Sequence, residues 1–215
     1  MKVALIGASG FTGKAIQQEL TNRGVNVIAI ARNPVNITDA AGVTKRPANV
    51  NDVAALAEAV AGADVVINAF NAGWTNPNLY QDYLAGAKAI QQASVRAGVS
   101  RLIVIGGAGT LQIDGKQLVD GPDFPAEYKA GATAVRDYFN HLKTETGTDW
   151  VFFSPAIEMH PGITTGRTGN FRLGGTTPVF DTNGRSVLSV EDLAVVIADE
   201  VVEPKHHRAQ FTAAY

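Results

Sequence analysis

The sequence contains no cysteine. This absence excludes disulfides, thiolate metal sites and a cysteine nucleophile, and it agrees with a reducing compartment. An excess of basic charge is also missing, since 18 Lys and Arg stand against 20 Asp and Glu for a formal net charge of -2. Without a basic stripe, nucleic acid is not an expected partner. The four histidines show no metal-ligand spacing with carboxylates, so no metal is expected.

Long apolar runs are absent as well. No stretch reaches the roughly 20 apolar residues that a membrane-spanning helix needs. The short apolar run at residues 3–6 passes directly into glycines, unlike a signal peptide. We therefore expect a cytoplasmic protein without a membrane partner. The 215 residues, 46% of them hydrophobic and 18% charged, have the size and composition of one globular domain.

Short apolar runs alternate with helical patterns along the chain. Strands are expected at residues 3–6, 25–31, 65–69, 102–105 and 150–154, with a short, mixed third strand at 43–46. Helices are expected at residues 12–23, 52–62, 79–98, 130–146 and 190–202. Apolar strands that alternate with helices indicate a parallel sheet covered on both faces. The predicted fold class is therefore α/β, a doubly wound parallel sheet of the Rossmann type.

Two irregular segments, residues 106–125 and 155–185, interrupt this alternation. Each follows the carboxyl end of a strand, which is where ligands bind in open α/β sheets. We predict one domain over residues 1–215, within which about 155–188 form a small lobe on the substrate side.

A glycine-rich motif, Gly7-Ala8-Ser9-Gly10-Phe11-Thr12-Gly13, joins the first strand to the first helix. The first glycine permits a sharp turn, the second lets the backbone approach a pyrophosphate, and the third allows the helix to pack tightly on the strand. The free amides of the helix N-terminus favour phosphate, and the hydroxyls of Ser9 and Thr12 add donors. The context of strand, glycine loop and helix predicts a nicotinamide dinucleotide site.

The end of the second strand bears on the choice of dinucleotide. NAD-binding versions place an acidic residue there to accept from the ribose 2′-hydroxyl. Here the strand ends in Arg32 and Asn33, and no acid follows until Asp39. A guanidinium suits a 2′-phosphate, and an exposed surface arginine is the alternative. The sequence therefore favours NADP(H), with NAD(H) as the second choice.

Later strand ends are expected to complete the cleft. The whole predicted cofactor site comprises Gly7, Ser9, Gly10, Phe11, Thr12, Gly13, Arg32, Asn33, Asn49, Val50, Ala69, Phe70, Asn71, Gly106, Gly107, Ala108, Pro155, Ala156 and Ile157.

Several of these runs resemble one known family. The glycine motif, residues 31–34, residues 101–109 and residues 154–156 are similar to the NADH-flavin reductase family, in the atypical, NmrA-like branch of the short-chain dehydrogenase/reductases. Residues 169–175 and 210–215 also look typical of it, so the resemblance covers nearly the whole chain. It implies a Rossmann domain with a small substrate-side lobe. It also implies reduction of a flavin (FMN or FAD, bound as substrate) or a similar small aromatic acceptor by NAD(P)H.

The chain departs from the wider superfamily at its catalytic motif. Short-chain dehydrogenases usually carry Tyr-x-x-x-Lys, but Tyr128 is followed at the fourth place by Ala132, and Lys129 is out of register. Biliverdin-IX-beta reductase, a relative of the family, has a serine and a histidine where this chain has Gly107-Ala108 and Pro155-Ala156. The catalytic residues are therefore unknown. Tyr128 and His160 are the candidates for a proton donor.

Flavin reduction tolerates these losses, because both reactive groups are organic molecules that the protein has only to orient. Phe70, Trp74 or Phe171 could stack an acceptor, with packing in the core or lobe as the alternative for each. Three functions remain: a reductase of a small-molecule acceptor, a non-catalytic NADP(H)-binding redox sensor, and an isomerase or epimerase, against which the missing tyrosine–lysine pair argues. A homodimer is left open.

Overall fold

The computed structural model describes residues 1–215 and contains one eight-stranded sheet. Its strand order is β3-β2-β1-β4-β5-β8-β10-β9. The seven parallel strands are β1 (Lys2–Ile6), β2 (Asn26–Ala31), β3 (Val43–Pro47), β4 (Val65–Asn68), β5 (Arg101–Ile105), β8 (Asp149–Ser154) and β10 (Ala209–Ala214). The short β9 (Arg172–Gly174) pairs antiparallel with β10 at one edge.

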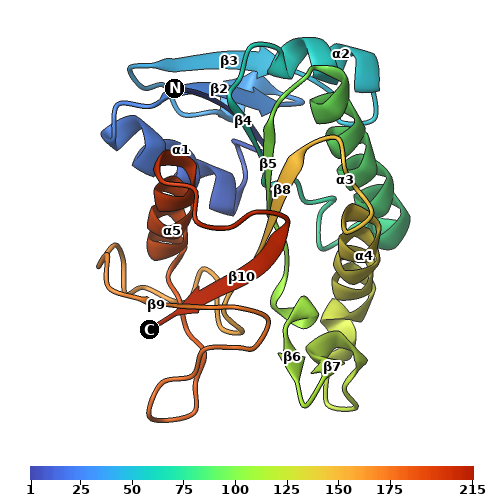
Figure 1. The fold of residues 1–215 in the computed structure, drawn as a ribbon, viewed down its shortest axis with the longest axis vertical. Coiled ribbons are helices and arrows are strands. Elements are labelled where there is room, and N and C mark those ends of the chain that lie inside the picture. The colour runs from blue at the N-terminus through green and yellow to red at the C-terminus, as the bar shows by residue number, and fades with distance from the viewer.

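Five helices cover the two faces of the sheet (Figure 1). α1 (Phe11–Asn22) and α5 (Val190–Val202) pack together on one face, and α2 (Val53–Val60), α3 (Leu79–Arg96) and α4 (Ala126–Leu142) lie on the other. Two apolar cores result, one on each side of strands such as β5, in which every residue is buried. This arrangement confirms the predicted doubly wound Rossmann-type sheet.

Local sequence explains where the helices begin. The side chain of Asp52 accepts a hydrogen bond of 3.0 Å from the Ala55 amide at the start of α2, and Ser189 Oγ accepts one of 3.0 Å from the Asp192 amide at the start of α5. Asp and Ser are among the residue types that commonly cap helices in this way. α4 begins at Ala126, four residues earlier than expected, because Pro125 stands directly before its first turn.

Two strands of the eight-stranded sheet were not predicted. β10 has only two strand formers, Phe211 and Thr212, and three of its six residues are alanines, which favour strands poorly. β9 has three residues and ends in Gly174, so it shows no periodic pattern. In contrast, the short third strand was correctly placed and pairs with β2 from Val43 to Pro47.

The two irregular segments emerge at the same edge of the sheet, where the parallel strands end (Figure 1). The first contains a hairpin of β6 (Gln112–Ile113) and β7 (Lys116–Gln117) beside the start of α4, and the second contains β9. They meet directly, since the Gln112 amide donates to the Thr176 carbonyl at 2.8 Å. No helix of the protein is both long and apolar enough to cross a lipid bilayer.

Candidate functional site

The loop between β1 and α1 is held in a fixed, tightly turned shape. Gly7 has a φ of +81°, a conformation that favours glycine. The amides of Gly7 and Ala8 both donate to the Ile30 carbonyl of β2, at 3.0 and 3.3 Å. A Cβ atom on Gly7 would lie 2.7 Å from the carbonyl carbon of Ala69, which follows β4. The loop therefore lies between the ends of β2 and β4, the strands on either side of β1.

The other two glycines of the motif differ in what they contact. A Cβ on Gly13 would overlap with the backbone of Gly7, so α1 runs directly against the loop. Gly10 is exposed, and a Cβ there would meet only the Gly7 carbonyl oxygen, at 3.3 Å. Packing therefore requires a glycine at position 13, whereas the bare backbone at Gly10 faces open space.

Four backbone amides in this loop have no acceptor within the protein. They belong to Ser9, Phe11, Thr12 and Gly13, and the first amide of the helix to find a partner is that of Lys14, which donates to Gly10 at 3.0 Å. The first turn of α1 carries no acidic side chain. Free amides at a helix N-terminus, together with its partial positive charge, form an arrangement that fits a phosphate group.

A polar cavity of about 330 Å³ opens beside this loop. Its lining consists of Ser9, Arg32, Asn33 and Asn36, with no acidic and no apolar residue among them. Arg32 is exposed and has neither a hydrogen bond nor an ion pair. The nearest acid along the chain, Asp39, is paired with Lys45 at 2.8 Å. The guanidinium is thus unneutralised and adjacent to the glycine loop.

Asn33 has a structural task in this cavity. Its Oδ1 accepts a 3.2 Å hydrogen bond from the Val35 amide and caps the 3-10 turn Pro34–Asn36. The carboxamide is oriented by this bond, which leaves its Nδ2 as a free donor.

The predicted residues after β3 and β4 reach the same edge but make mainly internal contacts. Asn49 Oδ1 accepts from the Asn51 amide at 3.1 Å, and the side chain of Val50 is buried. Asn71 Oδ1 accepts from the Gly73 amide at 2.7 Å. The ring of Phe70 stacks with Tyr83 at 6.1 Å between centroids and lies where a side chain on Gly86 would be. The Phe70 ring is therefore a packing element, and only the backbone of residues 69–71 faces the loop.

Sequence reasoning missed a buried polar cluster beneath Gly107 and Ala108. The Thr110 hydroxyl donates to the Gly107 carbonyl at 2.8 Å and lies 2.8 Å from Ser154 Oγ. Gln210 Nε2 of β10 donates to Ser154 Oγ at 2.8 Å. Thr110 follows β5, Ser154 ends β8 and Gln210 lies within β10, and because β10 was not predicted, no local pattern linked the three residues. The cluster fixes the backbone of residues 106–110.

The predicted residues after β8 divide between core and surface. Pro155 and Ala156 are buried, whereas Ile157 is exposed at the edge. Gly106, opposite them at the end of β5, is required by packing, because a Cβ there would overlap with the Phe152 ring.

The two candidate proton donors have different surroundings. Tyr128 lies in the first turn of α4, is exposed, and its hydroxyl has no hydrogen-bond partner. Lys129 turns away from it and donates through Nζ to the Val119 carbonyl, so no ammonium supports the tyrosine. His160 lies in an exposed turn, where its Nδ1 accepts from the Gly162 amide at 3.1 Å. Neither residue is bonded to the glycine loop.

The irregular segment after β8 is fastened to α5 by a buried carboxylate that sequence reasoning did not find. Asp192 is fully buried and accepts from the amides of Thr168 and Gly169 at 2.9 and 2.8 Å. Its other oxygen accepts from the hydroxyls of Thr168, at 2.6 Å, and Tyr215, at 2.8 Å. Burial raises the pKa of the Tyr215 phenol. The segment is thus fixed where it passes over the helix.

A second attachment joins the same segment to α1. Arg167 donates through two nitrogens to the Glu19 carboxylate, at 2.8 and 2.9 Å, and Arg23, directly after the last residue of α1, donates to it as well. The bond to the Arg167 guanidinium lowers the pKa of Glu19. The segment is therefore coupled to the helix whose other end carries the glycine loop.

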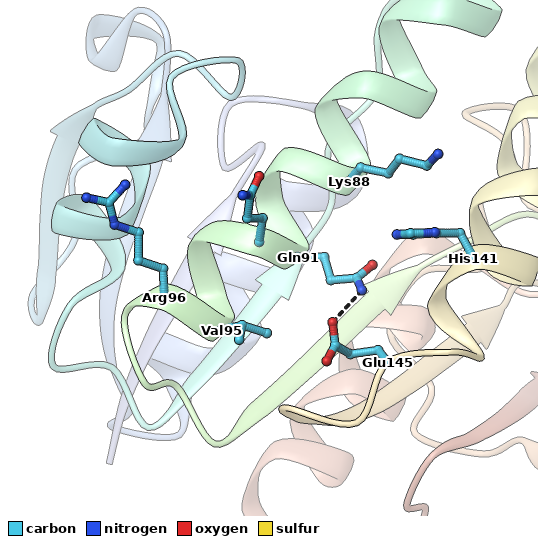
Figure 2. Close-up of a pocket in the computed structure, with 7 residues that line it drawn as sticks. Lys88, Gln91, Val95, Arg96, His141 and Glu145 are labelled. Atoms are coloured by element: carbon cyan, nitrogen blue, oxygen red, sulfur yellow. Dashed lines mark hydrogen bonds between the residues drawn. The ribbon is translucent and has the colours of Figure 1, made fainter.

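A second cavity, of about 650 Å³, lies between the C-terminal halves of α3 and α4 (Figure 2). Gln91 Nε2 donates to Glu145 Oε2 at 2.6 Å inside it, which lowers the pKa of Glu145. Helices that follow parallel strands run back toward the strands' amino ends, so this cavity is at the opposite edge from the glycine loop. None of the predicted site residues lines it.

Comparison with solved structures gives three close relatives that cover the whole chain. A Burkholderia pseudomallei protein, provisionally named an exported protein, shares 42% identity at a TM-score of 0.87, with 100% of each chain covered. A Bacteroides thetaiotaomicron protein, provisionally named an epimerase, shares 40% identity at a TM-score of 0.91, with 96% of its chain covered. A Streptococcus pneumoniae protein, provisionally named an NADH-flavin reductase, shares 31% identity at a TM-score of 0.88, with 99% of its chain covered.

The sequence itself matches a family model described as NAD(P)H-binding over residues 7–204. This match begins at the first glycine of the motif and includes every predicted cofactor residue. The chain therefore belongs to the NAD(P)H-binding family.

Proposed function

We propose that the protein is an NADPH-preferring oxidoreductase that reduces a flavin or a similar small aromatic acceptor. The observation that carries the cofactor choice is the cavity in which Arg32 stands unpaired beside Ser9, without an acidic residue. A 2′-phosphate there would receive charged hydrogen bonds from the guanidinium. A ribose 2′-hydroxyl there would have no carboxylate to accept a hydrogen bond from it.

The diphosphate of the same cofactor would lie on the free amides of Ser9, Phe11, Thr12 and Gly13. The exposed backbone of Gly10 leaves room for its approach. Toward the nicotinamide end, the fixed backbone of residues 106–108 would form one wall, and Pro155 to Ile157 another. These two segments follow the adjacent strands β5 and β8, so they lie side by side at the same edge of the sheet.

When bound, NADPH supplies the hydride, and the acceptor takes it up together with a proton. The chain's own part is to orient both rings and to limit the access of water. The tyrosine–lysine chemistry of alcohol–ketone conversion is not available, because Lys129 is directed to Val119 and Ala132 occupies the place of the missing lysine. This absence argues against an epimerase that relies on that pair. The name of the Streptococcus pneumoniae relative supports the choice of a flavin acceptor.

A non-catalytic NADP(H) sensor is the second candidate, since it too requires no tyrosine–lysine pair. One assay separates the two. Purified protein is mixed with NADPH and FMN or FAD, and the absorbance of reduced nicotinamide is followed, with NADH as the parallel cofactor. The reductase gives turnover that is faster at low NADPH than at low NADH. Tight NADPH binding in calorimetry without turnover on any flavin or quinone would assign the protein to the sensor class.

We propose that residues 155–188 form the substrate-side lobe of one domain over residues 1–215. Their attachments to α1 and α5 hold this lobe above the strand ends.

A further inference from the structure

Two large aromatic side chains lie exposed and in contact at the edge of the sheet that carries the glycine loop. Trp74 is 59% exposed and Tyr128 is 49% exposed, although both are large aromatic side chains. Their ring centroids are 5.6 Å apart, with an angle of 81° between the planes. Adjacent exposed aromatics that are not covered by the chain itself commonly mark a binding surface.

The structure provides a specific place for this pair. A Cβ on Gly131 would lie 2.9 Å from Trp74 Cζ3, so the absence of a side chain there lets the indole rest against α4. Leu79 lies on the same side, 3.1 Å from that Cβ position. The indole is thus supported from beneath while most of its surface remains free.

The other two aromatics considered for stacking are already used in packing. Phe70 stacks with Tyr83, and the half-buried Phe171 packs against the core beneath α1 and α5. Trp74 is the one candidate of the three whose ring is mainly exposed.

The pair is linked to two segments of the predicted cofactor site, the connection after β4 and the segment after β5. Trp74 belongs to the connection that leaves β4 at Ala69, the residue against which Gly7 packs. Tyr128 lies one helical turn before Ala132, whose Cβ is 3.2 Å from the position of a Cβ on Gly109. One aromatic is therefore linked to the glycine loop and the other to the segment after β5.

We propose that Trp74 and Tyr128 form the platform on which the flat ring of the acceptor stacks, a role that rests on the proposed reductase function. The chemistry fits a planar, electron-poor heteroaromatic such as isoalloxazine, because aromatic pairs gain from stacked and edge contacts beyond the area they bury. Tyr128 acts through its ring, and its hydroxyl is not required.

Steady-state kinetics test the platform. Trp74→Ala and Tyr128→Ala each raise the KM for FMN by roughly five- to tenfold, which is the loss of one aromatic contact, while calorimetry gives an unchanged Kd for NADPH. Tyr128→Phe keeps both the wild-type KM and the wild-type kcat, which separates a stacking role from that of a proton donor, whose loss would lower kcat. Val202→Ala removes an equally exposed apolar side chain from the far end of α5 and serves as the control. An unchanged KM for FMN in both alanine variants would overturn the proposal.

Fluorescence tests it independently of turnover. The protein has two tryptophans, and Trp150 is buried with its indole N–H unbonded, so Trp150→Phe breaks no hydrogen bond and leaves Trp74 as the only reporter. FMN added to this variant in the presence of NADP⁺ quenches the Trp74 emission with saturation. Saturable quenching without turnover would support the platform and reject the reductase. Turnover without quenching, or an emission that depends on protein concentration because a second copy covers the pair, would reject the platform.

Discussion

Gly13 lies so close to Gly7 that a Cβ on Gly13 would be 2.8 Å from the Gly7 carbonyl carbon and closer still to its oxygen. The atoms that a Cβ on Gly13 would meet belong to the backbone, so they cannot move aside by a change of rotamer as the end of a flexible side chain could. The contact fixes α1 against the loop whose amides it presents. Gly13 is therefore needed for the fold first and for binding only as a consequence.

Gly13→Ala should destabilise the protein by about 3 kcal/mol, the upper end of the usual range for overpacking. For a domain of this size that corresponds to a fall in Tm of roughly 6–12 °C. Calorimetric unfolding measures it, with Gly24→Ala as a comparison in which a Cβ meets no other atom and only the positive φ opposes alanine. A Gly13→Ala protein with wild-type Tm would contradict the observed contact.

Gly10→Val should leave the fold intact and abolish the binding of both NADPH and NADH. Gly10 has an ordinary φ of -79°, and a Cβ there would meet only one backbone oxygen, at 3.3 Å, so the fold tolerates a side chain there. A bound diphosphate would meet that side chain directly. Circular dichroism checks the fold and calorimetry the affinity. Unchanged affinity would mean that the phosphate does not lie on this loop.

Arg32→Glu should weaken NADPH much more than NADH. Removal of a charged hydrogen bond costs about 1.5–3 kcal/mol, which is roughly 10- to 100-fold in Kd, and the new carboxylate also repels the 2′-phosphate. Arg96→Glu makes the same charge change on an arginine of the opposite cavity and should alter neither affinity. Equal weakening of both cofactors by Arg32→Glu would refute the assigned contact.

Arg167→Met should lower the Tm by a few degrees at neutral pH and by progressively less in acid. The pKa of Glu19 is lowered in the folded protein by Arg167, so the stabilisation is fully present above the unfolded pKa of about 4.3 and is lost as the pH falls through the lower folded pKa. Paired melting curves of wild type and variant from about pH 7 to pH 3 follow the difference. If the difference in Tm between wild type and variant stayed constant over this pH range, the Arg167–Glu19 ion pair would not be the source of the stabilisation.

The fold was largely readable from the sequence because its parallel strands are buried on both faces and appear as continuous apolar runs. β5 is the clearest example, with every residue buried. β10 was not predicted because alanine favours helices. This segment forms a strand because it pairs with β8 and β9, which are distant in the sequence. Contacts of that range leave no local pattern.

The candidate site could be predicted from the sequence at those positions where the backbone geometry requires a particular residue type. A left-handed turn at residue 7 and a helix pressed against it require glycine, so Gly7 and Gly13 appear as a motif. Asp192 and Gln210 were not found, because each is a single polar residue in an otherwise ordinary helix or strand. Only the folded chain reveals that one holds Thr168 and the other holds Ser154.

The three residues of β9 cover the edge of β10, which matters for any variant in which the segment containing β9 is deleted. Thr212, Ala213 and Ala214 of β10 would otherwise present unpaired amides and carbonyls at the rim of the sheet. A strand left bare in this way recruits strands from other molecules. Variants in which residues 155–188 are shortened so that β9 is lost would therefore aggregate, even if their cores still fold. A lysine or a proline introduced into β10 would oppose this aggregation, because either residue disfavours pairing with a strand of another molecule.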